Sequence, residues 1–267
     1  MRWIWLGAAA ALGAAAATLA LTVGGQPRAA APVSPRSMAV VATVNGQGVP
    51  VRELELFLAQ ERAPTFAYFQ QHFGAGDSAG FWTTSHGGQT PRDYLEKLAL
   101  ADVTRATVQQ DLELTYGLLA DPGYASFLRA WQAENARRAL AISRHQVVYG
   151  PVQYTEADYF SYVSGQLADS LQTKLVQKGV ITVATPALRR YYLAHAAEYR
   201  QSANGNGQDT TVIGPVAPPA AAPFGKVRAQ VQQDYVQERY NALVTRLAGA
   251  ASVHVNPSIL SAVQVSL

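Results

Sequence analysis

The 267-residue sequence predicts a mainly helical protein with a small β-sheet made of strands from both ends of the folded region. Apolar residues recur at helical spacing through most of residues 50–248. Two short stretches, around residues 42 and 254, alternate apolar and polar residues as strands do. No segment repeats at a fixed period, which argues against a solenoid.

The folded region should begin with a hairpin. Val40–Val44 is expected to be a strand, and Asn45-Gly46 is a turn pair that accepts positive φ. A short return strand follows, and Pro50 opens a helix that we expect to end near Arg62. Beyond Pro64 the chain is dense in aromatic residues and glycine, and we expect a partly ordered insertion there.

Three long helices should come next. Thr90 is the expected N-cap of the first, which ends near Tyr116. The second begins at Asp121-Pro122, and the third follows the capping box Thr155–Asp158. The residues expected on the buried face of the second helix are Tyr124, Phe127, Leu128, Trp131, Asn135, Ala139 and Ile142.

The chain should close with two helices and a strand. Thr185-Pro186 opens one helix, and the amphipathic stretch Phe224–Ala248 forms the last. Ser252–Asn256 alternates like a strand with one buried face. Its pairing with residues 39–44 would join the two ends of the folded region.

A short pattern in the first hairpin and helix resembles that of a known family. The residues that carry it are Val44, Asn45, Gly46, Val49 and Glu53. They match the start of the SurA/PrsA-like family of extracytoplasmic foldases, and Tyr191, Tyr192 and Tyr199 resemble that family's helix before its isomerase domain. The resemblance implies a helical chaperone module with a structural role for the five motif residues.

The resemblance also implies a division of the chain. Residues 39–199 would be the chaperone region, which a helix and strand at 224–256 would complete before a tail at 257–267. The family's parvulin isomerase domain would lie between the two parts. Only residues 200–223 lie there, and domains rarely have fewer than about 50 residues. That stretch is polar, then rich in proline and alanine, and we expect a flexible linker without catalytic residues.

The N-terminal residues predict export. Arg2 precedes an uncharged, alanine-rich stretch, so residues 1–25 are expected to be a signal peptide or a membrane anchor. Residues 26–38, with three prolines, would then be a tether. The expected location is extracytoplasmic, either anchored in a membrane or secreted or periplasmic.

Composition excludes several classes of chemistry. Residues 40–267 carry 18 basic and 18 acidic residues, because three of the 21 basic residues and none of the 18 acidic ones precede them. This balance argues against nucleic-acid binding. The chain has no cysteine, and its five histidines show no metal-ligand spacing, so no metal, cofactor or catalytic residue is expected.

The function expected from the sequence is ATP-independent chaperoning of unfolded, newly exported polypeptides. Two alternatives stay open, a prolyl cis-trans isomerase and a non-catalytic envelope scaffold for one partner. Membrane contact would come through the N-terminal segment if it is not cleaved. Exposed apolar surface is what a chaperone needs to contact unfolded chains. The candidate client-binding residues are Phe66, Tyr68, Phe69, Phe73, Phe81 and Trp82, with core packing as their alternative role.

Overall fold

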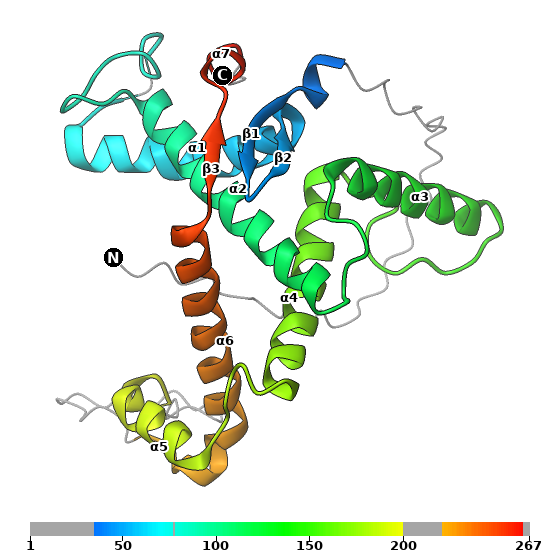
Figure 1. The fold of residues 1–267 in the computed structure, drawn as a ribbon, viewed down its shortest axis with the longest axis vertical. Coiled ribbons are helices and arrows are strands. Elements are labelled where there is room, and N and C mark those ends of the chain that lie inside the picture. The colour runs from blue at the N-terminus through cyan, green and yellow to red at the C-terminus, as the bar shows by residue number, and fades with distance from the viewer. Residues whose placement is uncertain (1–34, 77, 200–220, 264–267) are drawn as a thin grey trace, which may run out of the picture. The chain divides into compact units, whose positions relative to one another are not determined.

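The computed structural model describes residues 35–76, 78–199 and 221–263, shown as coloured ribbon in Figure 1. These residues form helices around a small sheet, which confirms the fold class expected from the sequence. The elements are η1 (Pro35–Met38), β1 (Val40–Val44), β2 (Gln47–Pro50), α1 (Val51–Phe73), α2 (Pro91–Thr115), α3 (Tyr124–Ser143), α4 (Glu156–Gln177), α5 (Thr185–Ala194), η2 (Ala196–Tyr199), α6 (Phe224–Ala250), β3 (Val253–Val255) and α7 (Pro257–Ser261).

The sheet joins the two ends of the folded region, as expected. Its strand order is β2-β1-β3 and both pairings are antiparallel. In the β1–β3 register Ala42 lies opposite Val255 and Val44 opposite Val253. All three side chains of β3 are exposed, so the expectation of one buried face is wrong. The sheet ends at β3, whereas β1 lies between two strands and buries Val41 and Val44.

The main core lies between the sheet and helices α1 and α2. Val41, Val44, Leu54, Leu95 and Val103 are each fully buried there. The chain beyond β3 also contributes, because α7 places Ile259 against this core and Val263 is buried in it. Full burial of one such side chain stabilises a fold by about 1.5–3 kcal/mol.

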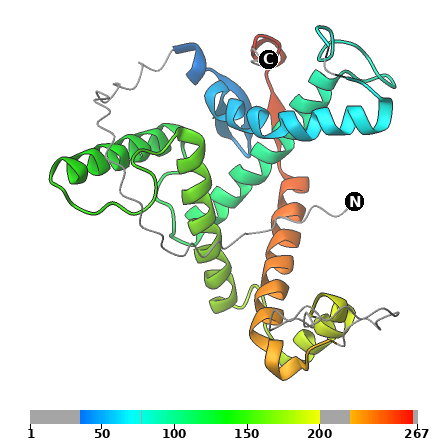
Figure 2. The same cartoon turned by 180° about the vertical axis from the view of Figure 1, so that it is seen from behind.

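Helix α6 connects three separate cores. Near its start Val231 and Tyr235 pack with Leu188 of α5, and farther along Tyr240 and Val244 pack with Leu171 and Leu175 of α4. At its end Leu247 and Ala248 reach the main core. Figures 1 and 2 show α6 running from α5 to the sheet. A helix of this length, 27 residues, spans about 40 Å.

Two helix-start signals and one turn signal of the sequence are correct in detail. Thr90 accepts a hydrogen bond from the backbone N–H of Asp93 at 3.1 Å, and Thr155 accepts one from Asp158 at 3.1 Å. Asn45 and Gly46 both have positive φ, at 50° and 86°. Each short-range signal therefore has the geometry that its residue types favour.

Helix α1 corrects the expected insertion after Pro64. The helix does not end near Arg62 but continues through Pro64 to Phe73. A proline inside a helix removes one backbone hydrogen bond and costs about 3 kcal/mol. Phe69 beyond it is fully buried, with its ring centroid 6.3 Å from that of Phe81, so burial of this part of the helix offsets that cost.

Helix α3 differs from its expected form at both ends. It begins at Tyr124 rather than at Asp121-Pro122, because the Asp121 carboxylate accepts a hydrogen bond from the Gly123 N–H and holds a turn there. Toward its C-terminus, Ala139 and Ile142 are exposed, contrary to the expected buried face. The side chains buried there are Arg138 and Ala141.

Glu53 at the start of α1 is a buried acid. Its side chain is 2% exposed, and burial raises its pKa to about 8. The place of Glu53 in the first turn of α1 would suit a capping or ion-paired carboxylate, but it has neither role. The helix is preceded by Pro50, which has no N–H for a capping carboxylate to accept, and no basic side chain among the described residues pairs with Glu53.

We predict that Glu53 makes the protein less stable as pH rises from about 5 to 8. The folded state holds the Glu53 proton up to a pKa of about 8, whereas the unfolded state loses it near its ordinary value of 4.5. Between these values the unfolded state binds fewer protons, so the free energy of unfolding falls by up to about 1.4 kcal/mol per pH unit.

The replacement Glu53→Gln should reduce this slope, measured by urea unfolding at several pH values, but not remove it, because burial also raises the pKa of Glu113 and of Glu61 to about 7. Asp169→Asn, which removes an exposed carboxylate from α4, is the control for loss of charge alone. An equal pH dependence in wild type and Glu53→Gln would contradict the prediction.

Candidate functional site

The family-motif residues lie in the hairpin and at the start of α1. Val44 and Val49 are buried in the main core. Asn45 bonds to the far end of the chain, because its N–H donates to the Ser252 carbonyl at 2.8 Å and its Oδ1 accepts from the Ser252 N–H at 3.1 Å. These residues therefore hold the fold together, and their described contacts are structural.

An ion pair next to Glu53 fixes α1 to α4. The Arg52 guanidinium donates to the Glu156 carboxylate from Nε and Nη2, at 2.6–3.0 Å. Tyr124 of α3 also donates to Glu156. Burial and the Glu156 carboxylate both raise the pKa of Tyr124, so its phenol stays a hydrogen-bond donor. Three helices thus meet at one carboxylate, in a structural arrangement without a nucleophile.

The six aromatic residues predicted to bind clients gather at the end of α1. Phe69 and Phe81 are buried, while Phe66, Tyr68 and Trp82 are half-buried against them. Phe73 is 43% exposed. Phe66 and Phe81 have ring centroids 5.0 Å apart, and Tyr68 stacks on Tyr94 of α2 at 4.5 Å. Most of this cluster is therefore packed inward, and a client-binding role for it stays a prediction.

Sequence reasoning missed a more exposed apolar surface in the connection between α3 and α4. Val147, Tyr149 and Val152 have 77%, 86% and 71% of their surface exposed. Leu140 and Ile142, on different sides of α3, and Tyr162 of α4, whose ring stacks on Tyr154 at 5.4 Å, are also exposed. We call these six residues the α3–α4 patch. The sequence signal was the run Val147-Val148-Tyr149 just before Gly150-Pro151, apolar residues placed at a turn.

A buried arginine fixes the backbone that carries the patch. Arg138 of α3 is 5% exposed, and its Nη1 donates to the carbonyls of Tyr149 at 3.0 Å and Pro151 at 2.6 Å. Its guanidinium also lies over the Tyr154 ring, 4.4 Å from the centroid. A planar guanidinium with several donors is suited to binding two carbonyls at once.

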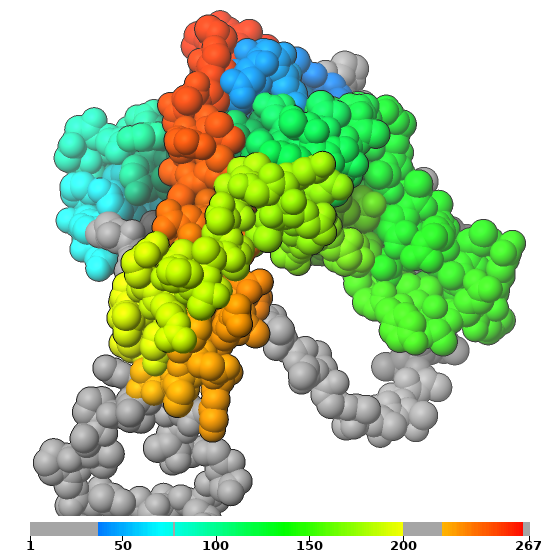
Figure 3. Space-filling model, turned by 60° about the horizontal axis from the view of Figure 1, so that its bottom comes forward, coloured from blue at the N-terminus to red at the C-terminus, as the bar shows by residue number. Residues whose placement is uncertain are grey.

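Two further α3 side chains anchor the end of this connection. Trp131 donates from Nε1 to the Tyr154 carbonyl at 2.9 Å, and Asn135 exchanges two hydrogen bonds with the Tyr154 backbone, each at 2.9 Å. The connection therefore runs back along α3, as Figures 1 and 2 show. In the space-filling view of Figure 3 the green atoms of this region form part of the surface. Apolar side chains are held outward on a fixed backbone.

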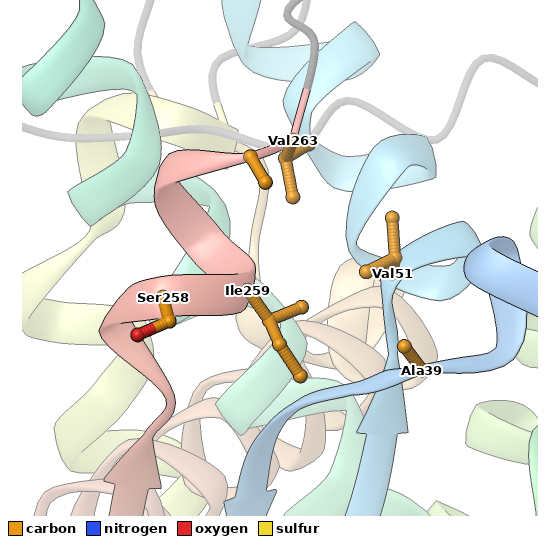
Figure 4. Close-up of a pocket in the computed structure, with 6 residues that line it drawn as sticks. Ala39, Val51, Ser258, Ile259 and Val263 are labelled. Atoms are coloured by element: carbon orange, nitrogen blue, oxygen red, sulfur yellow. The ribbon is translucent and has the colours of Figure 1, made fainter.

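A second apolar feature is a pocket beside the sheet. It has a volume of about 140 Å³ and is lined by Ala39, Val51, Ser258, Ile259, Ala262 and Val263. Figure 4 shows the aliphatic side chains of Val51, Ile259 and Val263 facing one another across it. Ser258 supplies the only side-chain polar atom among its lining residues. No acidic or basic side chain lies beside the Ser258 hydroxyl in this lining.

The described residues offer no metal site and no membrane span. Within residues 35–76, 78–199 and 221–263, no group of three or more His, Asp or Glu side chains is placed to hold a metal ion. No helix in the same ranges is long and apolar enough to cross a bilayer. The expected signal peptide or anchor at 1–25 and most of the tether lie outside the described residues.

The expected linker also lies outside them, except for its last residues. Residues 200–220 are not described, but the residues on either side of them are. The Ala222 N–H donates to the Tyr199 carbonyl at 2.8 Å, and Tyr192 donates to the Ala222 carbonyl at 2.8 Å. The two ends of this segment are therefore held together at the base of α6.

The fold and its surfaces define a helical protein with exposed apolar side chains. Comparison with known proteins gives one relevant similarity. Over 186 residues the chain is 26% identical to a protein of Bifidobacterium longum subsp. longum named "Chaperone for lacto-N-biosidase". The aligned part covers 70% of this chain and 60% of that protein. No family model matches the chain, and no solved structure matches it significantly.

We predict that Arg138→Ala loosens the α3–α4 connection. The replacement removes the donors to the Tyr149 and Pro151 carbonyls, and a hydrogen bond to a charged group contributes about 1.5–3 kcal/mol. Amide hydrogen exchange in residues 146–154 should become at least tenfold faster. Arg137→Ala is a matched control, because Arg137 also bonds to Glu134 but is 62% exposed and holds no loop carbonyl. Equal exchange in the two variants would rule out the anchoring role.

Proposed function

We propose that this protein is an ATP-independent chaperone that binds a client protein during folding. The observation that supports this most is the similarity to a protein named as a chaperone. The α3–α4 patch supports it further, because exposed apolar surface usually marks a protein interaction site. The chemistry required is binding alone, without nucleotide, metal or a covalent step.

The finer proposal is a SurA/PrsA-like chaperone that acts outside the cytoplasm. It is supported by the motif at residues 44–53 and by the uncharged stretch after Arg2. On this proposal the clients are exported polypeptides. The N-terminal segment either anchors the protein in a membrane or is removed.

A dedicated client is the second candidate. The relative's name gives one enzyme, a lacto-N-biosidase, as the protein that it assists. By analogy this chain would serve one secreted enzyme rather than many polypeptides, which approaches the scaffold alternative inferred from the sequence. A competition experiment distinguishes the two. Unrelated unfolded proteins displace a bound client from a general chaperone, but they do not displace the specific client from a dedicated one.

The prolyl isomerase alternative has a direct test. Uncatalysed isomerisation of an X–Pro bond takes tens of seconds or more at 25 °C. A peptide isomerisation rate equal to that background, with the full chain present, would remove this alternative. An accelerated rate would restore it and direct attention to residues 200–220.

We predict that the full chain suppresses aggregation of a denatured client in proportion to its concentration, without nucleotide. The measurement is light scattering after dilution of the client from denaturant. An inert protein at equal mass concentration is the control. Scattering that is unchanged at a severalfold excess of the chain would sink the general-chaperone proposal and leave the dedicated one, to be tested by co-expression with a candidate enzyme.

Photocrosslinking can locate the client. A crosslinker at Tyr149 should capture a denatured client, because that side chain is 86% exposed. The same group at Trp82 or Phe69 tests the aromatic residues inferred from the sequence. Capture there but not at Tyr149 would assign binding to the aromatic cluster, which would then have to open, since Phe69 is fully buried.

A further inference from the structure

The charge around the α3–α4 patch is one-sided. Residues 135–155 include three arginines and a histidine, at 137, 138, 144 and 145, and no aspartate or glutamate. Residues 40–267 as a whole carry 18 basic and 18 acidic residues. Glu134, one residue before this stretch, pairs with Arg137 and Arg138, so among the described residues the unpaired positive charge beside the exposed apolar side chains is that of Arg144.

The neighbouring carboxylates are already engaged. Glu134 binds Arg137 and Arg138, and Glu156 binds Arg52. Asp158 lies in the first turn of α4, where it accepts a hydrogen bond from Thr155 and faces the positive end of the helix dipole. None of the three is a free partner for a cation of the patch.

Arg144 is the arginine of residues 135–155 that pairs with none of these carboxylates. It is exposed at the end of α3, and among the described residues no carboxylate forms an ion pair with its side chain. Val147 and Tyr149 follow it within the same connection, on the backbone that Arg138 holds. An exposed cation thus lies in the same connection as exposed apolar side chains, and the backbone at Tyr149 and Pro151 is held by Arg138, which lowers the entropy cost of binding there.

Resting on the proposed chaperone function, we propose that the α3–α4 patch binds apolar client segments that carry acidic residues. The apolar side chains supply contact area, and Arg144 supplies the preference for aspartate or glutamate beside it. Charge complementarity of this kind sets specificity more than affinity. The patch would favour acidic over basic flanks by the worth of one exposed ion pair, about two- to fivefold in affinity.

The test uses the full chain and two labelled peptides with the same valine- and leucine-rich centre, one flanked by glutamates and one by lysines. Fluorescence anisotropy at low and high salt gives the affinities. The glutamate peptide should bind two- to fivefold more tightly, and salt should reduce the difference. Arg144→Glu should reverse the preference. Arg246→Glu, the same charge change on the exposed surface of α6, should not.

A second variant tests the apolar part. Val147→Ser with Val152→Ser should weaken both peptides about tenfold or more, because the two side chains are largely exposed and free to lose water on binding. The positions are in a loop, so the fold should persist, and circular dichroism checks it. Unchanged binding by this double variant would overturn the proposal.

The outcomes separate this proposal from the chaperone function. Suppressed aggregation with equal affinity for the two peptides, or with no effect of Arg144→Glu, would overturn the acidic-client proposal and leave chaperoning intact. Failure of both aggregation suppression and peptide binding would overturn both. Binding to anionic lipid vesicles that Arg144→Glu abolishes, without peptide binding, would also overturn it and make the patch a membrane-surface contact.

Discussion

The antiparallel pairing of β1 with β3 is the interaction on which the rest of the structure depends. It joins residues about 210 positions apart, and closing a loop of that length costs on the order of 5 kcal/mol of chain entropy. Burial of Val41 and Val44, together with the Asn45–Ser252 hydrogen bonds, offsets that cost. Once β3 is in place, the end of α6 is fixed, and the cores along α6 can form against α4 and α5.

The features that could be predicted from the sequence are those set by residues a few positions apart. Thr90 and Thr155 predicted helix starts, and Asn45-Gly46 predicted the turn, because each depends on residues only a few positions apart. The course of α1 through Pro64 was not predictable in the same way. Its explanation is tertiary, since it depends on burial of Phe69. The alternating pattern of β3 likewise did not reveal that all its side chains are exposed, and the strand order does not explain it, because β2 is also an edge strand and buries Val49.

The candidate site shows the same division. Aromatic residues among glycines suggested an exposed surface, yet Phe69 and Phe81 pack on each other with ring centroids 6.3 Å apart. The α3–α4 patch depends instead on Arg138, whose sequence neighbours give no sign that it is buried. Arg138 holds the carbonyls of Tyr149 and Pro151 toward α3, and the side chains of Tyr149 and Val152 in the same segment are exposed. Only the three-dimensional contacts reveal that relation.

The closure between Tyr199 and Ala222 has an evolutionary consequence. Because these two residues bond to each other, the folded body fixes both ends of the segment between them. The packing of the folded body then does not depend on the length of that segment. Whole modules can be gained or lost there without repacking α5 against α6. A lineage that exchanges a catalytic insert for a short connection would keep its binding surfaces unchanged. The same position is a natural entry point for grafting a reporter or a second binding domain.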